Sequence, residues 1–569
     1  MDNKDSLKEK FLNKKIKYLE SKMTNLLNTF NHRRKPNIFF VIVDEFRYPL
    51  EYESADLKQW KNENFQFAEQ LRAIGTEFHN HRTNTCACVP ARTTLQTGVY
   101  PAIHGSFSTD AVAKPATDPL MTWLPPFTVP TIGNYLKEHG YKTYLRGKWH
   151  MTHVNIEGES GRTYPTYDFY GTRMAEAEQF YAEKNVLKDF GYNGWIGPDA
   201  HGRLGTDTAS SAPPPKKSRD EAFVDQTIDI LDELDRQNTP WYVCTNLVDP
   251  HDIALRGDYT LLRTLNFQFL ADPTLPATLW TADFTASMMD DLSLKPPTQA
   301  NYRTIYPLAF QTISSIEDHW RYYYTLQKRV DQKLMQIFEK LQTMRSYNNT
   351  VIVYTSDHGD LLGSHGGLFQ KWYQAYEEAL HVPLIIASPL FQGEAVSDVY
   401  DLTSHIDILP TLVDIARGNI ESLRKSLSDK FSLAVPVPGI SIYPRVFDEE
   451  IADRPFFFYT EDDPTKGSTQ IGLTGVPYTS IAEPASCEAL VAKYGGQMWK
   501  STYYYNRTAP LRLPRTNSSI RELYNMTVDP YELNNLITSA DPGVAAARDY
   551  MDQLLVEKSF IYRNMLNQL

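Results

Sequence analysis

A loop of small residues runs into a predicted helix at Thr85-Cys86-Ala87-Cys88-Val89-Pro90-Ala91-Arg92-Thr93-Thr94-Leu95-Gln96-Thr97-Gly98. Pro90 suits the first helical position, because the N–H that proline lacks has no partner there. Cys88 would then precede the helix, where the helix dipole favours negative charge and the thiolate form. Arg92 adds a permanent cation that suits oxyanions. The local pattern fits two interpretations equally well: a reactive thiol beside an anion site, and a buried structural cysteine.

The chain of 569 residues is long enough for one large domain and a smaller one. Its formal net charge of −12 argues against a nucleic-acid binder, so an anionic substrate would need a local basic pocket. Four cysteines are too few for a disulfide framework, and Cys86-x-Cys88 lacks the second pair of a zinc site. Because no signal peptide or bilayer-spanning apolar run is visible, we expect a cytoplasmic protein without a membrane partner.

Four predicted strands each end in charged or ligand-type residues. A continuous apolar run is typical of a strand that is buried on both faces of a parallel sheet. One such ending is weak support, but four together describe a ligand site at the carboxyl edge of one sheet. The strands and their endings are 37–43 before Asp44-Glu45, 142–146 before Gly147-Lys148-Trp149-His150, 241–247 before Asp249-Pro250-His251, and 350–355 before Ser356-Asp357-His358-Gly359-Asp360.

Predicted helices separate these strands, which indicates a mixed α/β sheet that is covered on both faces. They span about 128–138 with Thr128 as N-cap, 220–236, 322–344 and 404–417, and one more strand is predicted at 384–387. Residues 155–219 and 254–312 have weak periodicity and are interpreted as insertions that line a pocket. From about residue 440 we predict short strands, among them 455–459 and 501–505, and a final helix over 544–567.

The order Cys88-x-Pro90-Ala91-Arg92, followed by Thr97-Gly98, resembles the signature of the sulfatase family, whose cysteine is oxidised after translation to formylglycine. The resemblance assigns this role to Cys88 rather than Cys86, because only Cys88 has proline two places on and arginine four places on. Further sulfatase-like landmarks follow in the family's order: Gly147-Lys148-Trp149-His150, Ser356-Asp357-His358-Gly359-Asp360, Val382-Pro383-Leu384-Ile385, and Glu522-Leu523-Tyr524 with Asp529-Pro530.

This resemblance covers most of the chain from Asn37 onward and implies a fold and a division into parts. The implied fold is an α/β, alkaline-phosphatase-like mixed sheet sandwiched by helices, with a smaller α+β C-terminal subdomain. We predict an N-terminal helical arm at 1–35, a sulfatase catalytic domain at 36–440 and the C-terminal subdomain at 441–569. An a/d stripe in the arm, Leu12, Ile16, Leu19, Met23, Leu26 and Phe30, fits a homo-oligomerisation arm or a helix packed on its own domain.

The resemblance also implies one divalent metal ion, held by Asp44, Glu45, Asp357 and His358. Glu45 holds a place where many members have a second aspartate. His358 takes a position that is asparagine in many arylsulfatases, and its presence is more similar to the choline-sulfatase and phosphonate monoester hydrolase branch. Carboxylate oxygens favour Ca²⁺ or Mg²⁺, with Ca²⁺ our first choice, and His358 leaves Mn²⁺ open.

The catalytic positions of the family match Lys148, His150, His251 and Lys371, while Arg92 matches the arginine that holds formylglycine. The resemblance thus implies hydrolysis of a small sulfate monoester by formylglycine made from Cys88, with a formylglycine-generating enzyme as partner during maturation. His251 or Lys371 would protonate the leaving oxygen, and His150 would act as base. Two alternatives stay open: a phosphonate monoester or phosphodiester hydrolase using the same site, and a non-catalytic protein that oligomerises through its N-terminal heptads.

Overall fold

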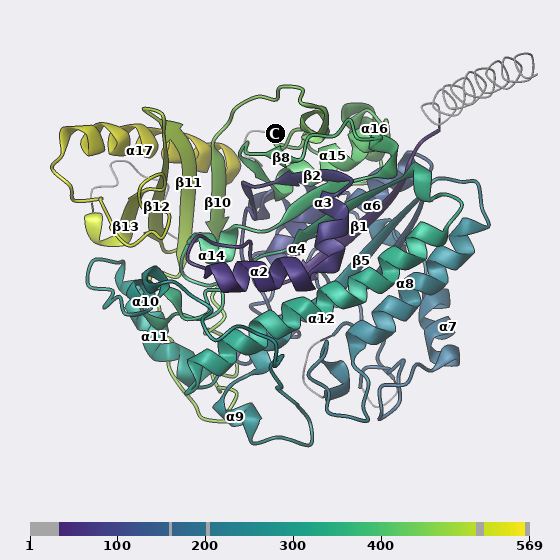
Figure 1. Cartoon of the computed structure of the whole chain (residues 1–569), viewed down its shortest axis with the longest axis horizontal. Helices are drawn as coiled ribbons and strands as arrows, with labels where there is room; N and C mark the ends of the chain where they lie inside the picture. Colours follow the sequence, from purple (N-terminus) through teal and green to yellow (C-terminus); the bar gives the residue numbers. More distant parts are fainter. Residues whose placement is uncertain (1–33, 159–161, 201–204, 508–516, 564–569) are drawn as a thin grey trace, which may run out of the picture.

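The computed structural model describes residues 34–158, 162–200, 205–507 and 517–563 (Figure 1). The predicted N-terminal helix and its heptad stripe lie outside these residues. A seven-stranded sheet occupies the centre of the molecule. Its strands, in spatial order, are β4 (Lys142–Gly147), β5 (Trp241–Pro250), β1 (Asn37–Asp44), β6 (Thr350–Ser356), β7 (Leu384–Ala387), β2 (Gly75–Phe78) and β8 (Asp398–Val399).

The first four strands of this order are parallel to one another. Ile38 of β1 lies opposite Tyr242 of β5 and Val351 of β6, and β4 pairs with β5 in the same direction. Their carboxyl ends therefore meet at one edge, as the sequence predicts. β7 runs antiparallel to β6, and β2 runs antiparallel to β7, so the sheet is mixed.

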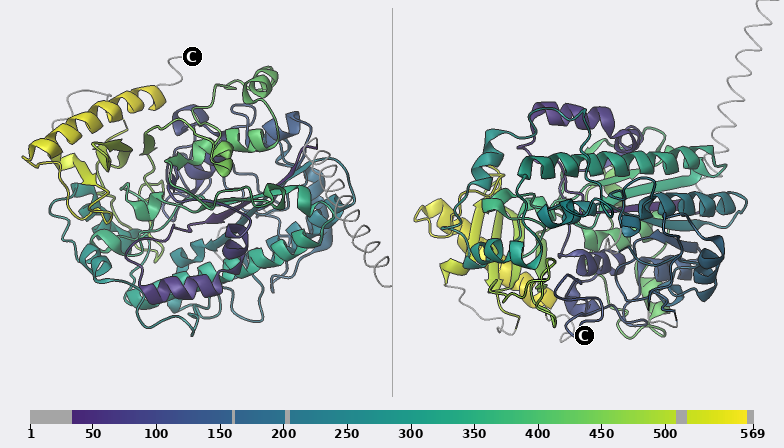
Figure 2. Two further views of the ribbon diagram at one scale, coloured as in Figure 1. Left: turned by 45° about the horizontal axis from the view of Figure 1, so that its top comes forward. Right: turned by 90° about the horizontal axis from the view of Figure 1, so that it is seen from below.

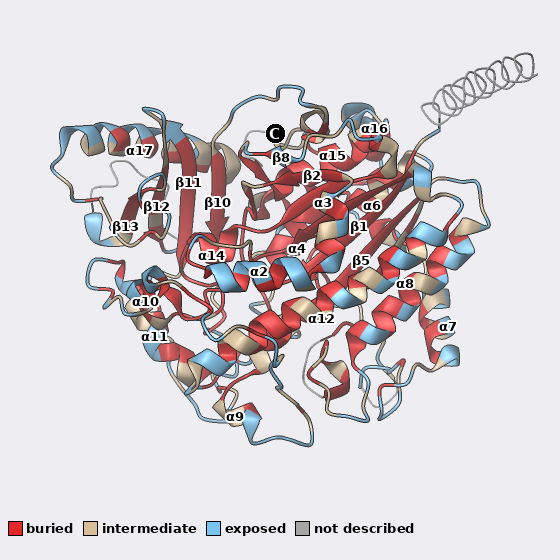
Figure 3. Cartoon of the chain, in the orientation of Figure 1, coloured by how far each residue is buried: buried red, intermediate tan, exposed pale blue. Residues whose placement is uncertain are grey.

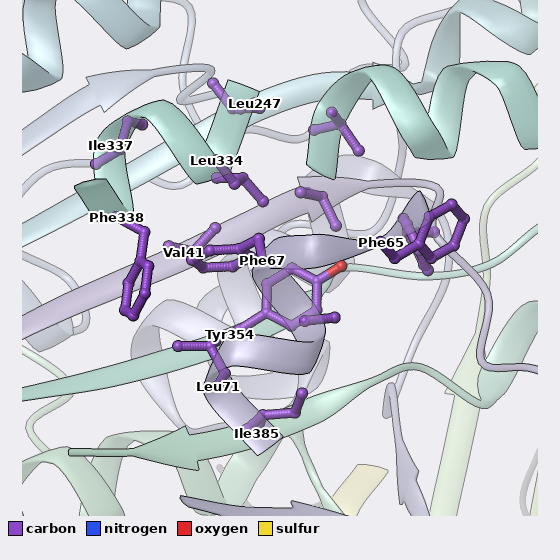
Figure 4. Close-up of a cluster of buried hydrophobic side chains, with 14 of the residues drawn as sticks. Val41, Phe65, Phe67, Leu71, Leu247, Leu334, Ile337, Phe338, Tyr354 and Ile385 are labelled. Carbon is purple, nitrogen blue, oxygen red and sulfur yellow. The ribbon is translucent and has the colours of Figure 1, made fainter. Parts of the chain in front are cut away.

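Alternate side chains of each strand supply two separate cores, one on each face of the sheet. Phe39, Val41 and Val43 of β1 pack with apolar residues of one layer of helices (Figure 4). This layer comprises α2 (Ala55–Asn64), α3 (Gln66–Arg72), α8 (Arg219–Asp235) and α12 (Ile316–Thr343). Figure 3 shows the sheet buried and the outer sides of α8 and α12 exposed in part.

The opposite face of the sheet carries the second core. Ile38, Phe40 and Ile42 of β1 point to this side. The helices that cover it are α4 (Cys88–Thr97), α6 (Ile132–Glu138), α7 (Ala175–Lys184), α15 (Ile408–Ile415) and α16 (Ile420–Leu427). The α/β sandwich predicted from the sequence is thereby confirmed.

Three predicted helix starts are wrong by a few residues. Helix α12 begins at Ile316 and not at residue 322. The other two differ for a local reason. Helix α4 begins at Cys88, so Cys88 lies inside its first turn and Pro90 is the third helical residue. Proline is tolerated there because the N–H groups of the whole first turn lack intrahelical partners. Thr131, and not Thr128, caps α6, because Asn134 at the third position completes a capping box with Thr131.

A second, antiparallel sheet lies at one end of the molecule, covered by the last helix (Figure 2). It consists of β10 (Phe456–Thr460), β11 (Ser486–Tyr494), β12 (Gln497–Tyr505) and β13 (Arg521–Asn525), and α17 (Pro542–Arg563) packs on it through Met551 and Leu555. The strands predicted at 455–459 and 501–505 are β10 and β12. This α+β unit agrees with the predicted fold, while the boundary at residue 440 stays a prediction.

Short elements connect these layers. They are β3 (His81–Arg82), α5 (Pro101–His104), α9 (Asp258–Leu261), α10 (Ala282–Met288), α11 (Pro297–Ala309), α13 (Ser364–Gly367), α14 (Glu377–Leu380) and β9 (Thr403–Ser404). All four cysteines carry free thiols. Within the part of the chain that the structure describes, no helix combines the length and apolar character needed to cross a bilayer.

Candidate active site

The carboxyl edge of the four parallel strands brings the predicted site residues together. Asp44 ends β1, Lys148 follows β4, His251 follows β5, and Asp357 follows β6. Helix α4 contributes Cys88 and Arg92 from the side of the second core. Contacts between neighbours link all ten residues predicted from the sequence into one cluster: Asp44, Glu45, Cys88, Arg92, Lys148, His150, His251, Asp357, His358 and Lys371.

Cys88 lies at the centre of this cluster and is only 2% exposed. Its Sγ atom lies 3.1 Å from Nε2 of His358 and 3.8 Å from Oδ1 of Asp44. Burial raises the pKa of the Cys88 thiol, but the positive charges of Lys371 and Lys148 outweigh it and bring the pKa well below its usual value. The position therefore favours a negative charge at this atom.

Three buried cations surround Cys88 and are held by the neighbouring carboxylates. The guanidinium of Arg92 contacts Oδ2 of Asp44 at 3.0 Å and Oδ2 of Asp357 at 2.9 Å. The ammonium of Lys148 lies 2.5 Å from the same Asp44 oxygen, and the ammonium of Lys371 lies 3.2 Å from Glu45. Burial lowers the pKa of Lys371, yet Glu45 and the Cys88 thiolate raise it above its usual value, so this lysine stays charged. The acidic protein thus gathers three cations around position 88, each of them paired with a carboxylate.

Backbone geometry aims the carboxylate of Glu45 into the cluster. Glu45 has a φ of 68°, an uncommon conformation for a residue other than glycine. Its N–H donates to Oδ1 of Asp357 at 3.1 Å, and its carbonyl accepts from the hydroxyl of Tyr323 at 2.7 Å. Nε2 of His251 lies 3.7 Å from the Glu45 carboxylate. Burial is the main cause that raises the pKa of Glu45 well above its usual value.

His150 is held by two aspartates. Its φ is 52°, and Asp199 fixes this backbone by accepting from the N–H groups of Trp149 at 2.7 Å and His150 at 3.1 Å. Nε2 of His150 lies 2.6 Å from Oδ1 of Asp110. Burial lowers the pKa of His150, but the Asp110 carboxylate outweighs it and raises the pKa to about 9.

The predicted metal ligands lie close enough together that they could hold a divalent cation. Ligand atoms of Asp44, Cys88, Asp357 and His358 all lie within 4.8 Å of one another, and the same holds for Asp44, Glu45 and His251. Both carboxylate oxygens of Glu45 and Oδ2 of Asp357 are buried with no hydrogen bond, although Lys371 lies 3.2 Å from Glu45 and Arg92 lies 2.9 Å from Asp357. Buried carboxylates of this kind are costly unless they are paired, and a bound cation would add to the pairing that Lys371 and Arg92 provide.

The orientation of the His358 ring is also compatible with a metal site. Its Nδ1 lies 3.0 Å from the carbonyl of Gly359, so this nitrogen carries a hydrogen and Nε2 is the atom that faces the cluster. Nε2 lies 3.7 Å from both Asp44 and Asp357. One imidazole with several carboxylates fits a hard divalent cation, and the donors leave the choice among Ca²⁺, Mg²⁺ and Mn²⁺ open.

The structure adds three acidic residues that the sequence reasoning missed. Asp110 and Asp199 hold His150, and Asp360 contributes to the raised pKa of Glu45. Asp360 is the last residue of the Ser356-Asp357-His358-Gly359-Asp360 motif, and this position in the motif could have indicated that it lies near the site. Asp110 and Asp199 lie in irregular segments that the sequence pattern does not connect to the site.

A mixed sheet between helices, with a potential nucleophile and a ring of cations and carboxylates at one edge, is an arrangement that suits a hydrolase for anionic esters. The sequence model of the sulfatase family matches residues 36–418, so the chain belongs to the sulfatase family and is a sulfuric ester hydrolase.

Individual relatives agree with this assignment. The uncharacterized sulfatase YidJ of Escherichia coli is 25% identical over 394 residues, covering 67% of this chain and 68% of that protein. The choline-sulfatase of Rhizobium meliloti is 25% identical over 439 residues, covering 74% and 75%. Among solved structures, the phosphonate monoester hydrolase of Agrobacterium radiobacter has a TM-score of 0.58 at 18% identity and covers 92% of this chain and 96% of that chain. This last likeness shows the shared fold alone.

Proposed function

We propose that the protein hydrolyses small sulfate monoesters with formylglycine, formed from Cys88, as nucleophile and with one divalent metal ion. The observation that carries the proposal is the position of the Cys88 side chain, which points at His358 and Asp44 and is surrounded by the positive charges of Lys148, Lys371 and Arg92. Such a ring of fixed cations stabilises the charge of a sulfate in the transition state.

Each residue of the site has a separate role in the proposed reaction. Lys148 and Lys371 bind the sulfate oxygens and neutralise their charge, while Arg92 orients the side chain at position 88. Asp44, Glu45, Asp357 and His358 would hold the metal ion, which would polarise the sulfate and acidify a hydroxyl at position 88. Formylglycine, once hydrated, supplies two hydroxyls on one carbon, one for attack and one for product release. His251 lies beside Glu45 at the mouth of the site, where the leaving oxygen would receive its proton.

Two measurements test this proposal. The first is the mass of the peptide that contains Cys88, from protein made in its own host: the aldehyde makes the peptide lighter and reactive to hydrazides. The second is sulfate release from small sulfate monoesters by metal-loaded protein, with Cys88→Ala as the inactive variant and Cys86→Ala as its control. A free Cys88 thiol in fully active protein would refute the formylglycine mechanism.

The same site can bind other tetrahedral oxyanions, and His358 keeps a second candidate open, a phosphonate monoester or phosphodiester hydrolase. Its Nε2 lies 3.1 Å from the Cys88 sulfur, so it contacts the reacting centre directly. Rates measured side by side on phenyl sulfate and on phenyl methylphosphonate separate the two functions. A faster phosphonate reaction would make sulfate hydrolysis the secondary activity.

A further inference from the structure

A cavity of about 570 Å³ opens beside His251, one of the site residues. This volume falls in the range of small-molecule pockets. The segment 254–312, interpreted from the sequence as a pocket-lining insertion, contributes Leu255, Tyr259, Phe267 and Phe310 to its wall. The other predicted insertion, 155–219, is absent from the described lining residues of this cavity. The cavity begins where the alcohol part of a bound ester would leave the catalytic cluster.

One wall of the cavity is flat and aromatic. The rings of Phe310 and Trp372 stack at 5.5 Å with an interplanar angle of 9°, and Tyr306 packs on Phe310 at 5.1 Å. The indole N–H of Trp372 donates to Asp462 at 3.0 Å, which fixes the ring in the wall. A rigid cluster of rings of this kind favours a planar apolar group, because apolar rings pack closely on its edges.

The charges around the cavity oppose a cationic guest. Lys371 holds its ammonium 5.1 Å from the centre of the Trp372 ring, and Arg263 holds its guanidinium 4.5 Å from that of Tyr259. These aromatic faces therefore already receive cations from the protein itself. The carboxylate in the lining, Asp110, is bound to His150 at 2.6 Å. The ammonium group of a guest would be repelled by two positive side chains, and the carboxylate near it is already paired with His150.

We infer that this cavity receives the alcohol part of the substrate, and that this alcohol is aromatic and carries no positive charge. The inference rests on the proposed function and names the substrate class of the same site. It separates this chain from its relative that is named a choline-sulfatase, since the cationic head group of choline does not suit the cavity. A sugar would place part of its hydroxyl-bearing surface against the Phe310 and Trp372 rings, so an aromatic group fits this wall better.

The test compares three esters whose sulfate is attached to a primary alcohol. These are 2-phenylethyl sulfate, choline sulfate and glucose 6-sulfate; the first two share the same two-carbon link and differ in the terminal group. We expect kcat/KM for 2-phenylethyl sulfate to exceed the other two at least tenfold. Sulfate release with choline sulfate or glucose 6-sulfate as the better substrate would overturn the inference and leave the proposed function standing. No sulfate release from any of the three would overturn the proposed function, and the inference with it.

Variants then test the cavity itself. Phe310→Ala should lower the ratio of kcat/KM between 2-phenylethyl and ethyl sulfate about tenfold, because it removes the outer ring of the stack. Phe169→Ala, which alters a ring that is 70% exposed outside the cavity lining, is the matched control and should leave the ratio unchanged. Arg263→Glu should improve choline sulfate relative to 2-phenylethyl sulfate. Equal losses on all substrates in Phe310→Ala, or no change in Arg263→Glu, would contradict the assignment.

Discussion

Nε2 of His150 lies 2.6 Å from Oδ1 of Asp110, and this contact determines the charge at one side of the site. The pKa of about 9 means that His150 is protonated at neutral pH, chiefly because the Asp110 carboxylate outweighs the effect of burial. A protonated imidazole suits a hydrogen bond to an anion, whereas the base predicted from the sequence must be neutral. The role of His150 therefore depends on Asp110.

Asp110→Asn should lower the pKa of His150 by at least one unit, because the amide carries no charge. If protonated His150 binds the sulfate, kcat/KM of the natural protein falls as the pH rises through about 9, and in the variant this fall moves to lower pH. The pH profile of kcat/KM measures the shift, and Asp110→Glu should restore the original profile. An identical profile in Asp110→Asn would contradict this account, and activity that rises through pH 9 would support His150 as base.

Metal binding should stabilise the folded protein independently of activity. A ligand that binds only the folded state adds about 2.7 kcal/mol at 100 times its Kd. We expect Ca²⁺, Mg²⁺ or Mn²⁺, added to chelator-treated protein, to raise the Tm with concentration. Asp357→Asn should abolish the rise, while Asp232→Asn, on the exposed part of α8, should retain it. A rise of equal size in Asp357→Asn would place the ion elsewhere.

A buried ionic network joins the second sheet to the active-site side of the molecule. The ammonium of Lys500 in β12 lies 2.8 Å from Glu377 and 2.7 Å from Glu532, and Arg82 also contacts Glu377 at 2.8 Å. Lys500→Met leaves Glu532 without its cationic partner and Glu377 with Arg82 alone, so we expect the free energy of unfolding to fall by about 3–5 kcal/mol. Lys430→Met, at an exposed pair, should change it by less than about 1 kcal/mol. Denaturant titrations of both variants provide the comparison.

Buried neutral histidines should make the protein sensitive to acid. Nδ1 of His104 accepts from the N–H of Ser106 at 3.1 Å, Nε2 lies 3.0 Å from the hydroxyl of Thr94, and burial lowers the pKa to about 3. Below pH 6.5 His104 binds a proton in the unfolded chain but stays neutral in the folded protein. The free energy of unfolding therefore decreases as the pH falls from about 6.5 towards 3.

The loss from this one residue is about 1.4 kcal/mol per pH unit. His104→Gln should reduce the slope of unfolding free energy against pH by that amount, as measured by urea unfolding between pH 4 and pH 6.5. Other buried histidines with lowered pKa values, among them His381 and His405 at about 3, contribute to the rest of the slope. An unchanged slope would show that His104 is already charged in the folded protein.

The sequence predicts the sheet and its ligand edge well because the information is local. Apolar runs such as 37–43 indicate buried strands, and the residues that follow them, Asp44 and Asp357 among them, must meet where parallel strands end together. The ligand residues also lie in motifs of fixed spacing, so their types and order point to one kind of chemistry.

The remaining features depend on tertiary packing that no local pattern shows. Asp110 and Asp199 lie in loops 40 and 49 residues away from His150 in the sequence. Only the fold brings Asp110 to the imidazole of His150 and Asp199 to its backbone N–H. Trp372 follows Lys371 directly, yet its place in the cavity wall depends on its contacts with Phe310 and Asp462. The start of α4 at Cys88 was missed because proline is acceptable at any position of a first turn.

The burial of Cys88 bears on the order of events while the chain is being made. Strand β10 closes over the loop before α4: the N–H of Tyr459 donates to the carbonyl of Asn84 at 3.1 Å, and Asn84 donates to Phe457 at 2.9 Å. Position 88 leaves the ribosome some 370 residues before this strand. Any enzyme that oxidises Cys88 must therefore reach it during synthesis or before β10 docks, and a variant that folds too quickly around this loop would be stable but permanently unmodified.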